Sequence, residues 1–187
     1  MNSLRDQRVL VLGLGHSGLA MARWCAGCGA QVTVWDSRAE PPQAVALREA
    51  SFEVPLLSGE LPAERATEWS LILKSPGLAP HDERIAPLLA AARAAGIRVA
   101  GELDLFALAL ADLKAARGYQ PKVVAITGTN GKTTTTALAS LLIERSGRRV
   151  ASAGIAIQND QDLRITPQAT RAPELPVGCV LKSSAFS

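Results

Sequence analysis

The stretch VLVLGLGHSG, residues 9–18, predicts the fold of the N-terminal part of the chain. Its first four residues form an apolar run typical of a buried parallel strand, and glycines follow at once in the spacing G-x-G-x-x-G. Such a turn lets a diphosphate approach the backbone closely, while the amides of the next helix point at its charge. Residues 32–35 predict a second strand that ends at Asp36. An acid at this place can accept hydrogen bonds from a ribose or another nucleotide group.

The turn alone leaves its ligand open. A glycine turn needed only for packing is one interpretation, and NAD binding is another, because dehydrogenases carry the same fingerprint. Two details argue against NAD. Ser17 adds a hydroxyl donor beside the turn, and Asp36-Ser37-Arg38 places a fixed cation next to the acid. An arginine there can pair with a phosphate, which fits NADP or a nucleotide sugar.

Strands and helices alternate along the rest of the first part. Residues 19–28, 43–50, 85–95 and 101–117 predict helices, and residues 71–73 and 97–99 predict strands. The alternation predicts an α/β fold with a Rossmann-like open parallel sheet. Residues 118–121 are the expected linker, so that the first domain is residues 1–118 and the second is residues 119–187.

The stretch TGTNGKTT, residues 127–134, lies between a predicted strand at 123–126 and a predicted helix at 133–146. A further strand is predicted at 149–152. In a P-loop, backbone amides wrap the phosphates, the lysine neutralises their charge and the Ser/Thr hydroxyl ligates Mg²⁺. The stretch departs from G-x-x-x-x-G-K-[ST], because Ile126 occupies the first glycine position and Gly128 comes two residues later. We therefore expect the first strand-helix-strand part of a P-loop ATP-binding domain, and two turns predict two phosphorylated ligands.

Composition excludes several classes of function. Aromatic residues make up 4% of the chain and the net charge is +3 with dispersed basic residues, which argues against a nucleic-acid partner. No apolar run approaches the roughly 20 residues of a membrane span, and the chain does not begin with a signal peptide, so a cytoplasmic protein without a membrane partner is expected. Three cysteines agree with a reducing compartment, and Cys25 and Cys28 are interpreted as small apolar residues of a helix.

Residues 127–134 resemble the ATP loop of the Mur ligases and the related folylpolyglutamate synthases. Residues 13–20 (GLGHSGLA), 36–38 (DSR), 75–77 (SPG) and 101–106 (GELDLF) resemble the branch of the Mur ligases that adds D-glutamate. The likeness covers residues 8 to about 154. It implies an ATP-dependent ligase of peptidoglycan synthesis that joins D-glutamate to UDP-N-acetylmuramoyl-L-alanine through an acyl phosphate, with ATP and Mg²⁺ as cofactors and a monomer as the expected state.

The resemblance also implies roles for particular residues. Substrate would be bound at the first turn, at the end of the second strand and at the 75–77 turn, by Gly15, His16, Ser17, Gly18, Asp36, Ser37, Arg38, Ser75, Pro76 and Gly77. ATP would be bound by Gly128, Thr129, Asn130, Gly131, Lys132, Thr133 and Thr134. Lys132 and Thr133 would be the catalytic residues, and Thr133 would ligate Mg²⁺.

The sequence departs from the family after the second domain's returning strand. Residues 153–157 read AGIAI where the family has Gly-Gly-Asn-Ile-Gly, and residues 158–176 show no regular pattern. If residues 180–186 align with a family strand, Lys182 replaces a glutamate that helps to hold Mg²⁺, a reversal that costs on the order of 10 kcal/mol at an effective dielectric near 20. The alternative is that this tail aligns with nothing.

Because the chain stops at Ser187, before the family's D-glutamate-binding domain, we expect no ligase activity from this polypeptide. A non-catalytic module that binds a UDP-sugar or nucleotide is the second interpretation, and an NAD(P) oxidoreductase is the third.

Overall fold

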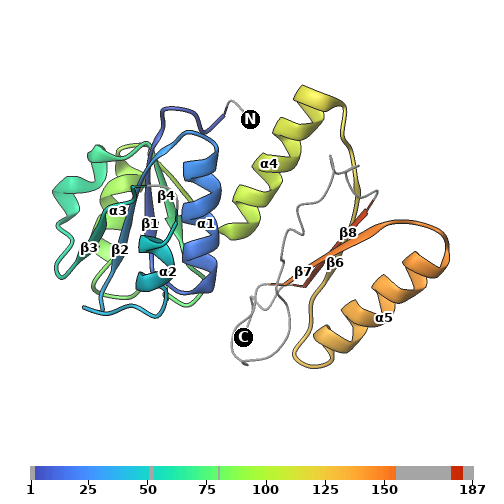
Figure 1. Cartoon of the computed structure of the whole chain (residues 1–187). Helices are drawn as coiled ribbons and strands as arrows, with labels where there is room; N and C mark the ends of the chain where they lie inside the picture. The colour runs from blue at the N-terminus through green and yellow to red at the C-terminus, as the bar shows by residue number, and fades with distance from the viewer. Residues whose placement is uncertain (1–2, 51–52, 80, 155–177, 183–187) are drawn as a thin grey trace. The chain divides into compact units, whose positions relative to one another are not determined.

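The computed structural model describes residues 3–50, 53–79, 81–154 and 178–182. The chain divides into two compact units, Met1–Ala116 (unit 1) and Arg117–Ser187 (unit 2) (Figure 1). Each unit has its own parallel sheet. Within the part of the chain that is described, no helix is both long enough and apolar enough to cross a membrane.

Unit 1 is built on a five-stranded sheet in which all neighbouring strands are parallel. The strands are β1 (Arg8–Leu12), β2 (Gln31–Asp36), β3 (Leu56–Ser58), β4 (Leu71–Lys74) and β5 (Arg98–Ala100). Their order is β3-β2-β1-β4-β5, so that the chain leaves β1 to one side and returns to its other side at β4. This arrangement confirms the Rossmann-like open sheet. In such sheets ligands bind outside the carboxyl ends of the strands, where the strand order reverses.

Helices cover both faces of this sheet (Figure 1). They are α1 (His16–Gly27), α2 (Ala44–Arg48), a short 3₁₀ helix η1 (Ala63–Glu68) and α3 (Ala86–Ala94). A further helix, α4 (Glu102–Arg117), follows β5, and its Leu105 belongs to the same buried cluster as α1. Alternate residues of β1 point to opposite faces, as the pleat requires. Val9 and Val11 pack with α1 in one buried cluster, and Leu10 and Leu12 pack with α3 in the other. All four are fully buried, which is why this strand is a continuous apolar run.

Two elements of unit 1 were not predicted, and one begins earlier than predicted. β3 is a three-residue strand at the sheet edge, and η1 is a single short helix; both are too short to show a period in the sequence. α1 begins at His16 rather than at residue 19, because Gly15 is itself the N-cap of the helix. The glycine turn and the helix N-terminus are therefore one structure.

Unit 2 contains the predicted strand, helix and strand, with one more strand between them. The predicted elements are β6 (Lys122–Ile126), α5 (Lys132–Arg145) and β7 (Val150–Gly154). A further strand, β8 (Gly178–Lys182), pairs in parallel with both β6 and β7, so that the sheet order is β6-β8-β7. The side chains of Ser140 and Ser152 are hydrogen-bonded at 2.6 Å and so join α5 to β7. Residues 158–176, predicted to be irregular, lie outside the described residues.

The end of β8 lies at the edge of the sheet from which the second glycine turn departs. Lys182 pairs with Ile126 on one side and with Gly154 on the other. The family-like stretch 180–186 thus begins inside a strand, as its resemblance suggested, and residues 183–186 lie outside the described part.

Candidate functional site

The glycines of the first turn differ in what the fold demands of them. Gly13 has a φ of +88°, and a Cβ on Gly18 would lie 1.8 Å from the carbonyl oxygen of Gly13. These two positions need glycine for conformation and for packing. Gly15 has an ordinary φ of −90°, and a Cβ built there meets nothing within 4 Å. Packing therefore explains Gly13 and Gly18 and leaves open space in front of Gly15.

The N-terminus of α1 faces this open space. The helix begins at His16, its cap Gly15 supplies no side-chain hydrogen bond, and its first turn contains no acidic residue. The first amides of a helix lack intrahelical partners and carry a partial positive charge, which suits an anion. The structure places His16, which is exposed, and Ser17, which is half-buried, at the start of this helix, as predicted.

Asp36 is buried and its carboxylate is saturated by protein donors. Its side chain is 3% exposed. One oxygen accepts from the backbone and Nε of Arg38 at 3.0 and 2.8 Å, and the other accepts from the Leu14 amide at 2.7 Å and from Arg38 Nη2 at 2.8 Å. Burial opposes ionisation, but the hydrogen bonds from Arg38 and Leu14 outweigh it and lower the pKa of Asp36 to about 2.

These four hydrogen bonds give Asp36 an internal structural role. A carboxylate has about four lone-pair sites, and protein groups occupy all four. The sequence suggested a hydrogen bond to a ribose or nucleotide group; the structure shows a residue that joins the first turn, through Leu14, to Arg38. Sequence reasoning missed this internal role, because it depends on where the amide of Leu14 points.

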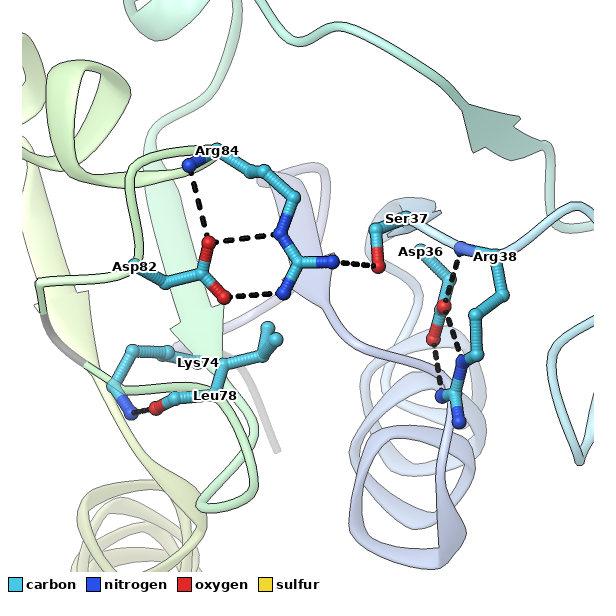
Figure 2. A network of polar contacts seen from close by, with 7 residues as sticks. All are labelled: Asp36, Ser37, Arg38, Lys74, Leu78, Asp82 and Arg84. Carbon is cyan, nitrogen blue, oxygen red and sulfur yellow. Dashed lines mark hydrogen bonds and ion pairs between the residues drawn. The ribbon is translucent and has the colours of Figure 1, made fainter.

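Arg38 is held at one edge and exposed at the other. Two of the five guanidinium N–H groups donate to Asp36, and the side chain is 54% exposed (Figure 2). The hydrogen bond to Asp36 raises the pKa of Arg38 further, so the side chain keeps its charge at any physiological pH. The result is a fixed cation beside the turn, as the D-S-R spacing predicted.

The turn that follows β4 lies against the first turn. A Cβ on Gly13 would stand 3.1 Å from the Cβ of Ser75 and from the Cδ1 of Leu78. Lys74 holds this segment together, since its Nζ donates to the carbonyls of Leu78 at 2.6 Å and Ser75 at 3.3 Å. Burial lowers the pKa of Lys74. The structure thus brings residues 75–77 beside the turn as predicted, and it adds Lys74, which no sequence pattern had marked.

A second Asp-x-Arg arrangement follows β4. Arg84 donates to Asp82 from its backbone at 3.1 Å, from Nε at 2.8 Å and from Nη2 at 2.5 Å. Its Nη1 donates to the hydroxyl of Ser37 at 2.8 Å (Figure 2). The shared spacing of residues 36–38 and 82–84 was a signal that sequence reasoning did not use. Ser37, predicted to bind substrate, accepts this bond from Arg84.

The second glycine turn, in unit 2, leads directly into a helix. Gly131 has a left-handed φ of +76° and is the N-cap of α5, so the amides of that helix open onto the turn. The Nζ of Lys132 donates to the carbonyl oxygens of Gly128 and, at 3.3 Å, Thr129. No acidic residue lies in the first turn of α5. Residues 128–134 are therefore gathered around a helix N-terminus with a cation above it, an arrangement that fits a phosphate.

For a metal ion, the described residues offer little on their own. Among them, no group of three or more His, Cys, Asp or Glu side chains could hold a metal ion. Mg²⁺ at a nucleotide commonly takes phosphate oxygens, waters and only one or two protein ligands. Thr133, at the second position of α5, therefore fits as a single hydroxyl ligand that needs a bound nucleotide beside it.

Comparison with known proteins gives two family matches. Residues 7–101 match "Mur ligase MurD-like, N-terminal domain", and residues 126–176 match "Mur ligase middle domain". The UDP-N-acetylmuramoylalanine–D-glutamate ligase of Albidiferax ferrireducens is 52% identical over the whole chain, residues 155–187 included, and that of Burkholderia pseudomallei strain K96243 is 52% identical over 95% of it.

The chain spans only about a third of these curated relatives, 36% and 35% of their lengths. Among solved structures, a pseudomurein peptide ligase type C from Methanothermus fervidus is 22% identical, with 95% of this chain and 33% of that chain covered and a TM-score of 0.46.

Proposed function

Because this chain belongs to the Mur ligases, with an N-terminal domain of the MurD-like type, we propose that it serves the addition of D-glutamate to UDP-N-acetylmuramoyl-L-alanine. In this cytoplasmic reaction unit 1 binds the uridine diphosphate end of the substrate, and unit 2 binds ATP. The relatives that are 52% identical carry the name of this ligase, which supports the choice of substrate. The reaction of the whole enzyme remains part of the proposal, since the chain covers 36% of such a relative.

The open, unforced position of Gly15 carries the proposal for unit 1. Neither backbone conformation nor packing requires glycine there, whereas a diphosphate lying on the amides of α1 would meet any added side chain. Arg38 supplies a fixed, half-exposed cation next to the same amides. Ser17 and Ser75 add hydroxyl groups within the two adjoining turns. Together these groups suit an anionic nucleotide sugar.

The arrangement of Asp36 argues against an NAD(P) oxidoreductase. In dinucleotide-binding folds, the acid at the end of the second strand accepts hydrogen bonds from the ribose of NAD. Here the four acceptor sites of Asp36 are filled by Arg38 and Leu14, and its side chain is 3% exposed. A ribose would have to displace the bonds that hold the turn. We therefore propose that Asp36 positions the turn and Arg38 and does not touch the ligand.

Unit 2 is proposed to hold the triphosphate of ATP on residues 128–134. The amides at the N-terminus of α5 would bind the phosphates, and Lys132 would exchange the carbonyls of Gly128 and Thr129 for phosphate oxygens. The hydroxyl of Thr133 would ligate Mg²⁺, which supplies further neutralisation of phosphate charge when it is bound. Binding of ATP also separates this proposal from that of a bare UDP-sugar module, which needs no second turn.

Calorimetry with the whole chain tests the assignment of unit 1. We expect UDP-N-acetylmuramoyl-L-alanine and UDP to bind, and Arg38→Ala to weaken both by about tenfold or more, because it removes a charge-assisted contact. Arg65→Ala is the control: Arg65 also makes a two-bond ion pair, with Glu68 on η1, and its side chain is 38% exposed against 54% for Arg38. A folded chain that does not bind UDP, or that binds NADH in its place, refutes the assignment.

A further inference from the structure

Arg84 is fixed on two sides by residues from different loops. On its own loop, Asp82 accepts three hydrogen bonds from it, two of them from the guanidinium. On the loop after β2, at the carboxyl ends of the strands, the hydroxyl of Ser37 accepts a hydrogen bond from Nη1 at 2.8 Å, although the two residues are 47 positions apart in the chain. Nε, Nη1 and Nη2 thus each have a protein partner. A guanidinium is a planar fork, so two groups that bind its different edges are held at a fixed distance from one another.

The strand order shows what this bond spans. Ser37 directly follows β2, and Arg84 lies between β4 and α3. β1 lies between β2 and β4 in the sheet, and the Gly13–Gly15 turn leaves its carboxyl end. The Arg84–Ser37 bond therefore connects the two loops that flank this turn, at the edge where the strand order reverses. That edge is where the proposed ligand lies.

Ser37 lies between the two residues that shape the first site. Its neighbour Asp36 accepts the amide of Leu14, inside the turn, and its other neighbour Arg38 provides the exposed cation. The loop after β2 is half-buried at Ser37 and exposed at Arg38. A hydrogen bond to Ser37 from outside the loop restricts the positions that Arg38 can take.

We propose that Arg84 is a ligand-positioning residue, which holds the Asp36–Arg38 loop against the β4 loop and so keeps Arg38 beside the Gly13–Gly15 turn before the ligand arrives. The inference rests on the proposed binding of a uridine diphosphate group at this turn. Arg84 acts through Ser37, to which it donates from Nη1, while Asp82 holds its Nε and Nη2. Asp82 serves the same end by orienting the guanidinium, in the way that Asp36 orients Arg38 (Figure 2).

A double-mutant cycle with UDP as the probe measures this role. If removing Arg84 leaves the loop in its competent arrangement for a fifth of the time or less, the apparent Kd for UDP rises about fivefold or more. Arg84→Ala and Ser37→Ala should each weaken binding by that factor, and the double variant should be no weaker than the weaker single variant. Arg84→Lys keeps the charge but lacks the fork, so the loss should persist. Arg65→Ala should bind UDP as the unaltered chain does.

Hydrogen exchange of the ligand-free chain gives a readout that does not depend on UDP. Arg84→Ala should speed exchange of the Leu14 and Arg38 amides, which both donate to Asp36, whereas Arg65→Ala should leave them protected. Unchanged protection, or unchanged UDP affinity in Arg84→Ala, overturns the inference. Additive losses in the double variant also overturn it, because they would mean that Arg84 contacts the ligand itself. If the unaltered chain does not bind UDP, the proposed function fails, and exchange still decides whether Arg84 orders the loop.

Discussion

Replacing Gly15 and Gly18 separately with alanine should divide the first turn into a ligand-facing half and a packing half. The two positions are three residues apart in one turn, and the change is one methyl group in each. In Gly18→Ala the new Cβ would stand 1.8 Å from the carbonyl oxygen of Gly13, a backbone atom that cannot swing aside. In Gly15→Ala the new Cβ meets nothing within 4 Å and the φ of −90° is ordinary. Gly18→Ala should therefore lower the stability of unit 1, whereas Gly15→Ala should leave stability almost unchanged and weaken ligand binding.

The magnitude for Gly18→Ala follows from this contact. Relief needs a shift of more than 1 Å between α1 and the end of β1, whose residues Val9 and Val11 pack against that helix. Overpacking of this kind typically costs about 1–3 kcal/mol, and a backbone partner places it at the upper end. Alanine is otherwise favoured over glycine in a helix by about 1 kcal/mol, so a net loss must come from the contact. A loss of about 2 kcal/mol would lower the Tm of a domain this size by roughly 8–16 °C.

For Gly15→Ala the opposing terms nearly cancel. Alanine is a poorer N-cap than glycine and lowers stability by several tenths of a kcal/mol. It also lowers the conformational entropy of the unfolded chain, which raises stability by a similar amount. Stability should change by less than about 0.5 kcal/mol. Binding of UDP should weaken about tenfold or more, since the methyl group occupies the space proposed for the diphosphate.

Tryptophan fluorescence during guanidinium unfolding measures both variants selectively. All three tryptophans, Trp24, Trp35 and Trp69, belong to unit 1, so the signal reports this unit even if unit 2 unfolds separately. Calorimetry with UDP follows on the same samples. A stable Gly18→Ala variant would contradict the packing argument, and a Gly15→Ala variant that binds UDP normally would show that no ligand lies on this turn.

Three further outcomes are expected. The pKa of Asp36 is lowered from 3.8 to about 2, so its ionised form stabilises unit 1 above pH 3.8. This contribution, on the order of 2 kcal/mol, is lost as the pH falls towards 2. In urea unfolding, the stability of Asp36→Asn should not fall over this pH range as that of the unaltered chain does. Lys132→Met should weaken ATP binding about tenfold or more without changing UDP binding, because Lys132 lies in the second glycine turn and hydrogen-bonds there to Gly128 and Thr129. Equal ATP binding in calorimetry would contradict the second site. Cys25 is fully buried, and burial raises its pKa to about 12. Iodoacetamide at pH 8 should therefore alkylate the half-buried Cys28 before Cys25. Peptide mass spectrometry that finds the reverse order would refute this.

Most of the architecture of unit 1 could be predicted from the sequence because the signals for it are local. A four-residue apolar run, a glycine turn and an acid at the end of the next strand each come from neighbouring residues. Gly15, Gly18 and Arg38 were identified from such spacing. The structure places both glycines at the N-terminus of α1 and bonds Arg38 to Asp36, which also accepts the amide of Leu14 in the turn. β3 was missed because it has only three residues and lies at the sheet edge, where none of its side chains is fully buried. Such a segment shows no alternation of apolar and polar residues in the sequence.

The partners of the site residues were beyond the sequence because they depend on the sheet order. The bond from Arg84 to Ser37 joins loops 47 positions apart, and it exists because β2 and β4 flank the same strand. Lys74 gave no signal either, since its two acceptors are backbone carbonyls that become neighbours only when the β4 turn closes. Spacing predicts which residues share an edge, whereas hydrogen bonds between loops require the fold.

The two turns present amides to an anion by different physical means. In unit 1, close packing of Gly18 on Gly13 sets the helix against its strand, and a saturated carboxylate then fixes a cation beside it. In unit 2, the left-handed Gly131 starts the helix, and the cation, Lys132, donates to the carbonyls of Gly128 and Thr129 in its own turn. A guanidinium held by two strong bonds cannot follow a ligand, whereas a lysine on neutral carbonyls can exchange them at little cost. We therefore propose that the first site selects a ligand of one shape, and that the second can follow a phosphate whose position changes during the proposed reaction.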